Sequence, residues 1–175
     1  IFKAFGDYKL PVYIYLTAIP VWFFGLNAFA VRFISALAGT LAILGIYLLT
    51  KQVTSYKEEK SGSDSLATIA ALLLAISPWH FFISRPALEA NLALTFIIFG
   101  FYFLLLFLQK QESIKGLFSA IFLGLSLHTY NTARVFVPLL LLTTILIYKS
   151  AFMSALRKSL AVKSCPYSSH TGCSK

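Results

Sequence analysis

The chain has 175 residues, of which 58% are hydrophobic and only 12% are charged, and its mean hydropathy is +0.79. A soluble domain of this size has no interior large enough to bury that much apolar surface, so we predict a membrane protein. The net charge of +9 does not indicate nucleic-acid binding, because a basic balance in a membrane protein mostly reflects cytoplasmic loops and lipid headgroups.

Residues 1–27 are predicted to form the end of a first extracytoplasmic loop together with a juxtamembrane helix. The first residue is Ile1 rather than Met, and we expect an upstream part of the protein ahead of it. The apolar stretch Pro11–Phe24 has 14 residues, contains Pro20, and is shorter than the 20 or so residues that a bilayer crossing requires. We therefore expect this helix to lie at the membrane interface. Its aromatic anchors would be Tyr13, Tyr15 and Trp22.

Residues 28–148 are predicted to form an all-α, polytopic transmembrane helical bundle with about five spans. The predicted spans are 28–50, 66–83, 87–108, 113–128 and 134–148. The last two are short, and we interpret them as a hairpin whose arms extend into the flanking polar residues or lie deep in the bundle. In the first span, Ser35 and Gly39 have the spacing that permits close helix packing.

Residues 149–175 are predicted to be a basic cytoplasmic loop or a truncated tail. This segment contains Cys165, His170 and Cys173, whose spacing is weak support for a metal site or a disulfide. We interpret it as an unstructured end.

The distribution of Lys and Arg predicts the orientation of the bundle. If the helices alternate in direction, ten basic residues fall on one side of the membrane and five on the other. Because the more basic side faces the cytoplasm, Arg32, Arg85 and Arg134 are predicted to be extracytoplasmic.

Polar residues from four separate parts of the sequence are predicted to meet on the extracytoplasmic face. A charge beside an apolar segment is costly, and the planar guanidinium group is well suited to phosphate. The arginines therefore suggest a site for a phosphate attached to a lipid, and a carboxylate there could deprotonate an acceptor hydroxyl or hold a metal. The residues on this face are Asp7, Lys9, Asn27, Arg32, His80, Arg85, Glu89, Asn91, His128, Tyr130, Asn131 and Arg134.

Each of these residues also has a simpler explanation. Arg32 can extend its charged end to the interface, and Arg134 can contact lipid headgroups. Arg85 can pair with Glu89, four residues later on one helical face. Loop charges, headgroup contacts or interfacial hydrogen bonds equally explain Asp7, Lys9, His80 and His128.

Three segments of the chain together form a pattern that extends over most of its length. In the first, Lys9-Leu10-Pro11-Val12-Tyr13 is followed by Phe24-Gly25 and by Arg32 at the start of a span. The segments 77–94 (SPWHFFISRPALEANLAL) and 123–142 (LGLSLHTYNTARVFVPLLLL) continue the pattern, which covers about residues 5–148. These segments resemble membrane glycosyltransferases of the GT-C class, and the most similar group is the dolichyl-phosphate-mannose-protein mannosyltransferase-like family, which includes the aminoarabinose (lipid A) transferases. Leu10 departs from the family pattern, which has proline at this position.

The resemblance implies a partial GT-C fold and a transferase of the cell membrane, as in protein glycosylation or cell-envelope synthesis. Such an enzyme moves a monosaccharide from a polyprenyl-phosphate donor to a protein, lipid or glycan acceptor on the extracytoplasmic side.

The resemblance also implies roles for individual residues. The family's catalytic base is an acid of the first extracytoplasmic loop, so the main base is expected upstream of Ile1 and the fragment alone is expected to be inactive. Asp7 lies one position from the acid that precedes the family's lysine and is the catalytic candidate in this chain. The candidates for donor-phosphate contact are Lys9, Arg85 and Arg134. The candidates for orienting an acceptor or a metal are Glu89, His128, Tyr130 and Asn131, and the need for a divalent metal stays open.

Two other classes of function fit the same residues. A polytopic transporter or flippase for a lipid-linked anion would use the arginines without an acid. A structural membrane subunit would use the outer polar turns only as headgroup anchors.

Overall fold

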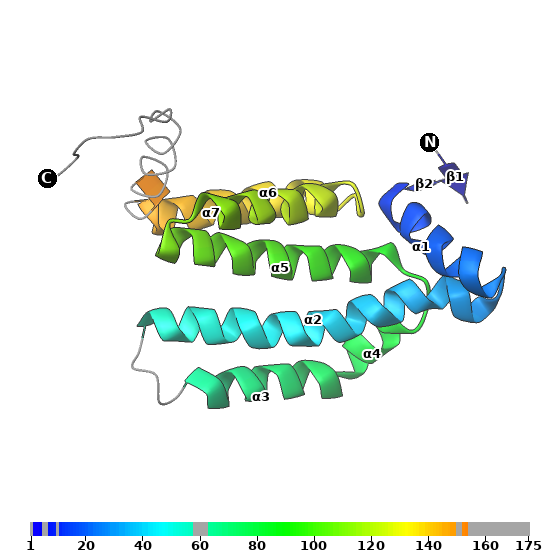
Figure 1. Cartoon of the computed structure of the whole chain (residues 1–175), viewed down its shortest axis with the longest axis horizontal. Coiled ribbons are helices and arrows are strands. Elements are labelled where there is room, and N and C mark those ends of the chain that lie inside the picture. The colour runs from blue at the N-terminus through cyan, green and yellow to red at the C-terminus, as the bar shows by residue number, and fades with distance from the viewer. Residues whose placement is uncertain (1, 5–6, 10, 58–62, 150–151, 154–175) are drawn as a thin grey trace, which may run out of the picture.

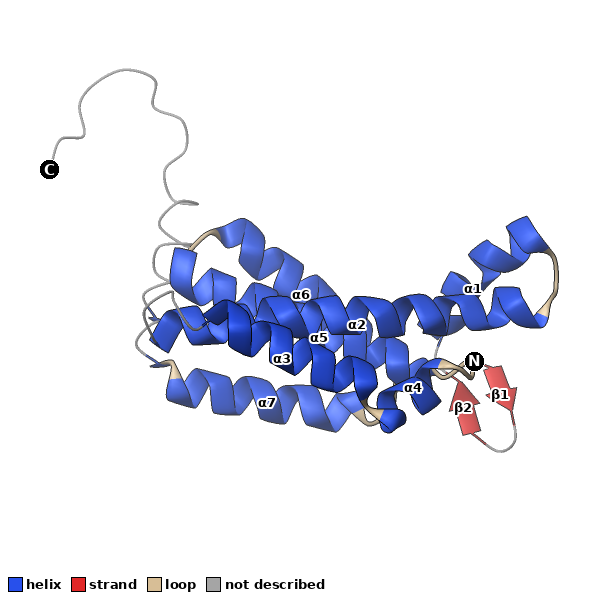
Figure 2. Ribbon diagram, turned by 90° about the horizontal axis from the view of Figure 1, so that it is seen from below, coloured by secondary structure: helices blue, strands red, loops and turns tan. Residues whose placement is uncertain are grey.

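The computed structural model describes residues 2–4, 7–9, 11–57, 63–149 and 152–153, and these form a helical bundle preceded by a small hairpin (Figure 1). The hairpin consists of β1 (Phe2–Ala4) and β2 (Asp7–Lys9), which pair antiparallel with Phe2 opposite Lys9. It lies beside α1, as Figure 2 shows. The predicted all-α bundle is confirmed, with these two short strands as an addition that the sequence analysis did not predict.

The first helix, α1 (Pro11–Phe24), has the bounds that the sequence predicts. Proline is favoured in the first turn of a helix, where its missing N–H costs nothing, and Pro11 occupies that position. The helix is followed by Gly25, whose positive φ of 73° is a conformation that glycine adopts without strain. The chain then turns into the next helix, and the Tyr13 hydroxyl donates a hydrogen bond to the Val31 carbonyl at 3.3 Å.

The central element of the bundle is α2 (Ala28–Lys57), which packs against α1, α3 and α5. Small residues on its buried faces allow the neighbouring helices to approach closely. Ser35 accepts a hydrogen bond from the Asn91 side chain of α5 at its backbone carbonyl, 2.7 Å away, and Thr95 of α5 donates to the Ala38 carbonyl at 2.9 Å. The buried small residues of α2 are Ala30, Ser35, Ala38 and Ala42.

The predicted span 66–83 is not one straight helix. The structure divides it into α3 (Ser63–Ile76) and α4 (Pro78–Ser84), which meet at an angle of 61°. The cause is Pro78, because a proline disfavours helical geometry in the residue before it, and Ser77 has an extended ψ of 118°. The sequence predicted an unbroken helix here, which the bend corrects, whereas the bent pair can still form the single crossing that was predicted.

The remaining helices are α5 (Glu89–Lys110), α6 (Ser113–Leu127) and α7 (Ala133–Ile147). Gln111 separates α5 from α6 in a left-handed conformation with φ of 54°. Phenylalanine rings join the two helices, since Phe103 of α5 stacks on Phe118 and Phe122 of α6 at centroid distances of 5.5 and 5.7 Å. Val137 of α7 is buried against α5 and α6 in a cluster with Leu123 and Ala133.

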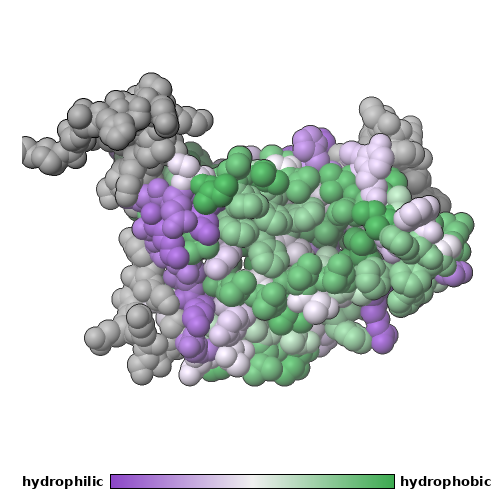
Figure 3. Space-filling model, in the orientation of Figure 1, coloured by the Kyte–Doolittle hydropathy of each residue, from purple (hydrophilic) through white to green (hydrophobic). Residues whose placement is uncertain are grey.

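Successive long helices alternate in direction, as predicted (Figure 1). The ends of α2 and α5 meet at one end of the bundle, where the Gln52 amide donates to the Gln109 side chain and Lys51 pairs with Asp64 at 2.7 Å. Arg32, Arg85 and the turn before Arg134 belong to the opposite end. Figure 3 shows a broad apolar surface along the helices, with hydrophilic residues gathered mainly at one end.

Two helices in the described part of the chain, α2 and α5, are long and apolar enough to cross a membrane, and the bent α3–α4 pair can provide a third crossing. The 15-residue helices α6 and α7 are shorter than the 20 or so residues of a full crossing. The membrane bundle is thus confirmed, while the count of five spans stays a prediction. The predicted tail beyond Met153, with its two cysteines, lies outside the described residues.

Candidate functional site

A cavity of about 530 Å³ lies between α2, α3 and α4, at the end of the bundle where the arginines gather. Both Arg32 and Arg85 line it, although 53 residues separate them in the sequence. The other lining residues are Ala36, Gly39, Thr40, Ile43, Ala75, His80, Phe81 and Ser84.

Arg32 reaches the cavity because of its register on α2. Residues 32, 36, 39, 40 and 43 of α2 line the cavity, and this spacing of three and four residues defines one helical face. The Arg32 side chain is exposed, so its guanidinium group is accessible to a ligand. The fold does not bear the free-energy cost of burying an unpaired charge at this position.

Arg85 is positioned by the short helix α4. It follows the last residue of that helix, Ser84, and its guanidinium carbon lies 4.3 Å from the centre of the Phe81 ring. A cation over an aromatic face is attracted by the electrons of the ring, which limits the conformations that the arginine adopts. The Arg85 side chain remains exposed and lines the cavity from the α4 side.

His80 joins α4 to α2. It is buried, with 8% of its surface exposed, and its Nε2 atom lies 3.1 Å from the Gly39 carbonyl oxygen. Because a carbonyl oxygen only accepts hydrogen bonds, Nε2 carries the hydrogen. On the same turn, the Ser84 hydroxyl donates to the His80 carbonyl at 2.7 Å.

Gly39 allows a close approach between α2 and α4. A Cβ atom at this position would lie 2.9 Å from the Ser84 Cβ, nearer than carbon atoms normally approach. The absence of a side chain therefore lets α4 settle against α2, which brings Arg85 to the same cavity as Arg32.

The cavity is electropositive. Two guanidinium groups line it, and none of its described lining residues is Asp or Glu. Two such groups favour an anion with several acceptor oxygens, and phosphate matches the planar arrangement of guanidinium donors.

Glu89, which the sequence analysis paired with Arg85, begins a different helix. Since α4 ends at Ser84 and α5 begins at Glu89, the two residues do not share a helical face as the four-residue spacing suggested. The Glu89 carboxylate also influences Tyr13 of α1 through its charge. Burial raises the pKa of the Tyr13 phenol above its ordinary value, and the charge of Glu89 adds to the increase. As an acid in the first turn of α5, Glu89 also stabilises that helix end.

Arg134 does not line the cavity of Arg32 and Arg85. It lies in the first turn of α7, where its Nε atom donates a long hydrogen bond of 3.4 Å to the Leu127 carbonyl. A cation at the carboxyl end of α6 interacts favourably with the helix dipole. The three other predicted residues of this turn, all exposed, are His128, Tyr130 and Asn131.

The backbones of Asp7 and Lys9 lie in β2, directly before α1. Their side chains lie outside the part of the chain that the structure describes. The predicted roles of both residues therefore stay predictions.

No group of three His, Cys, Asp or Glu side chains that could hold a metal ion occurs within the described ranges. Two polar side chains that line the cavity with the arginines, His80 and Ser84, already bond to backbone carbonyls.

Arg32 and His80 were predicted to share one face with Arg85 but were not included among the donor-phosphate residues, and both line the cavity with Arg85. Gly39 and Ser84 were not recognised as parts of a site. A usable signal was present in two short spacings: a glycine, Gly39, follows Arg32 by seven residues, and a histidine, His80, precedes Arg85 by five.

Comparison with known proteins gives one line of support. The family model of dolichyl-phosphate-mannose-protein mannosyltransferase matches residues 9–165, most of the chain. No curated protein and no solved structure matches the chain.

Proposed function

Because this chain belongs to the dolichyl-phosphate-mannose-protein mannosyltransferase family of membrane glycosyltransferases, we propose that it serves the transfer of a monosaccharide from a polyprenyl-phosphate donor to an extracytoplasmic acceptor. In this proposal, the cavity of Arg32 and Arg85 binds the phosphate of the donor. The single observation that supports it is the convergence of these two arginines, from separate helices, on one cavity beside an apolar surface.

The chemistry of the transfer explains why cations are useful at this position. The acceptor hydroxyl oxygen forms a bond to the anomeric carbon of the sugar while the bond from that carbon to the phosphate oxygen breaks. The hydroxyl proton passes to a carboxylate base, and the polyprenyl phosphate leaves with the electron pair. Guanidinium groups stabilise the negative charge that grows on the departing phosphate.

The other predicted residues take proposed roles around this cavity. The base is an acid of the loop that precedes α1, for which Asp7 is the candidate in this chain, and Lys9 is a further candidate for phosphate contact. The exposed turn between α6 and α7 belongs to the same end of the bundle (Figure 1). Its residues His128, Tyr130 and Asn131, together with Glu89, are the proposed contacts for a protein, lipid or glycan acceptor.

The decisive experiment supplies membranes containing the protein, in its full natural length, with a polyprenyl-phosphate monosaccharide carrying a labelled sugar. We expect the label to move to an acceptor while free polyprenyl phosphate appears in equal amount. The loss of this transfer in a folded Arg32→Gln/Arg85→Gln protein would support the assignment of the cavity. A protein that transfers no sugar from any such donor would contradict the proposal.

One observation favours an alternative function, a transporter or flippase for a lipid-linked anion. Helices broken near a binding site are common in transporters, and the α3–α4 pair is bent by 61° beside the cavity. The same assay separates the two functions, because a flippase would move the intact labelled lipid between leaflets without releasing polyprenyl phosphate.

A further inference from the structure

The cavity that Arg32 and Arg85 line is next to a second cavity. Thr40, Ile43 and Ala75 line it and also line a second, apolar cavity of about 380 Å³ farther along α2 and α3. The two cavities therefore adjoin along α2 and α3, and we refer to them together as the α2–α3 groove. The residues that line only its farther part are Leu44, Tyr47, Thr68, Ala71 and Leu72.

The groove has the shape of a site for a long chain. Arg32 and Tyr47 mark its two ends on α2, and these positions, 15 residues apart, are separated by about 22 Å of helix. This length exceeds the half-thickness of about 15 Å that the acyl chains of one leaflet fill. Small side chains, Ala71 and Ala75, keep the α3 side of the groove open.

The two ends of the groove differ in charge. Arg32 and Arg85 lie at one end, whereas the walls toward Tyr47 are apolar apart from two threonine hydroxyls and the tyrosine phenol. One turn beyond Tyr47, Lys51 forms an ion pair with Asp64 at 2.7 Å. This ion pair links α2 to α3 beyond the apolar end of the groove. A ligand that fits must carry an anionic group at one end and a long apolar chain behind it.

We propose that the α2–α3 groove holds the isoprenoid chain of the donor lipid, with the phosphate of that lipid between Arg32 and Arg85. This inference rests on the proposed function and adds the path of the lipid chain to it. The lipid would lie along α2 past the middle of the membrane, with the sugar at the extracytoplasmic end.

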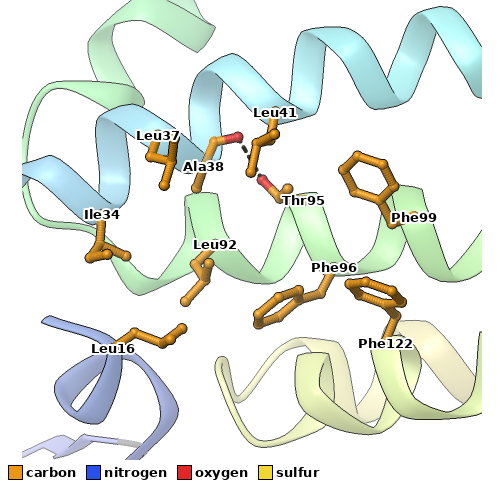
Figure 4. Close-up of a pocket in the computed structure, with 10 residues that line it drawn as sticks. All are labelled: Leu16, Ile34, Leu37, Ala38, Leu41, Leu92, Thr95, Phe96, Phe99 and Phe122. Atoms are coloured by element: carbon orange, nitrogen blue, oxygen red, sulfur yellow. Dashed lines mark hydrogen bonds between the residues drawn. The ribbon is translucent and has the colours of Figure 1, made fainter. Parts of the chain in front are cut away.

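A second apolar groove on the bundle provides an internal comparison. It has a volume of about 330 Å³ and lies between α1, α2, α5 and α6 (Figure 4). Leu37 and Leu41 line it from α2, and the rings of Phe96, Phe99 and Phe122 line it from α5 and α6. None of its described lining residues is charged, so it offers no contact for a phosphate.

The test uses a polyprenyl phosphate with a photoreactive group in the middle of its isoprenoid chain, added to the unmodified protein in nanodiscs. After illumination and digestion, we expect cross-links in residues 43–47 of α2 and 68–75 of α3. Cross-links confined to the groove of Phe96, Phe99 and Phe122 would overturn the inference and leave the proposed function intact.

A pair of variants adds a quantitative readout. Ala71→Trp fills the α2–α3 groove, and Leu37→Trp fills the comparison groove. We expect Ala71→Trp to weaken the binding of a long polyprenyl phosphate at least about tenfold, but to leave a short-chain isoprenyl phosphate unaffected. Leu37→Trp should change neither affinity.

Each other result has a defined meaning. Equal binding of long and short chains, with no effect of Ala71→Trp, would overturn the inference alone. A wild-type protein that binds neither lipid would contradict the proposed function as well.

Discussion

The Nε2 atom of His80 lies 3.1 Å from the carbonyl oxygen of Gly39, and this contact connects the end of one transmembrane segment to the middle of another. Because α4 carries Arg85 immediately after Ser84, the contact also determines where that arginine lies relative to Arg32. The geometry of the cavity thus depends on a buried contact that involves no arginine.

Gly39→Ala is expected to move α4 away from α2, because the new methyl group would lie 2.9 Å from the Ser84 Cβ. We predict a loss of stability of about 1–3 kcal/mol, measured by thermal unfolding in nanodiscs, and weaker binding of polyprenyl phosphate. Gly124→Ala is the matched control, since a Cβ there meets nothing within 4 Å. Equal stability of both variants would show that α4 does not need this close approach.

His80→Phe keeps a ring of similar size but removes the hydrogen bond to Gly39. We predict a loss of about 1 kcal/mol in the free energy of unfolding, together with a lower affinity for polyprenyl phosphate as Arg85 shifts. The exposed His128 provides the control, and His128→Phe should leave both quantities unchanged. An unchanged affinity in a folded His80→Phe protein would remove His80 from the role of positioning Arg85.

Asn91→Asp tests the buried contact between α2 and α5. The Asn91 amide donates to the Ser35 carbonyl at 2.7 Å, and its side chain is 1% exposed. An ionised carboxylate cannot donate, so the variant should be less stable than Asn91→Ala by about 3 kcal/mol at neutral pH.

The effect of Asn91→Asp should also depend on pH in a defined direction. The protonated carboxyl can donate a hydrogen bond to the Ser35 carbonyl where the ionised form cannot, so stability should be regained as the pH falls. The check is to measure the unfolding midpoints of Asn91→Asp and Asn91→Ala from pH 4 to pH 8 and to compare their difference at each pH. A constant difference over that range would mean that water reaches position 91.

Arg134→Gln is expected to leave the affinity for polyprenyl phosphate within about twofold, because Arg134 lies outside the cavity and bonds only weakly to the Leu127 carbonyl at 3.4 Å. Titration of the variant with the lipid provides the measurement. A tenfold loss would instead support the prediction from sequence that Arg134 contacts the donor phosphate.

Several elements of the fold could be predicted from the sequence because their signals are local. The bounds of α1 follow from Pro11 and Gly25, and the alternation of the helices follows from apolar segments separated by polar turns. The break between α3 and α4 required weighing Pro78 against an otherwise continuous apolar run, and the apolar run was given too much weight.

The candidate site was harder to predict, because it depends on which helices are neighbours. The sequence shows that Arg32, Arg85 and Arg134 lie at the same end of the bundle, but it does not show that α2 packs against α4 while α7 packs against α5 and α6. For that reason Arg85 was named as a candidate phosphate contact and Arg32 was not, although both line the same cavity. The phosphate contact of Arg85 stays a prediction.

The most direct test of the account is the affinity of the protein in nanodiscs for a polyprenyl phosphate, measured for the wild type, Arg32→Gln, Arg85→Gln and the double variant. Lys110→Gln, at the opposite end of the bundle, is the control. We predict that each single arginine variant raises the dissociation constant about tenfold, that the double variant raises it further, and that the control has no effect. An unchanged dissociation constant in a correctly folded double variant would contradict the claim that Arg32 and Arg85 together hold a lipid-linked phosphate.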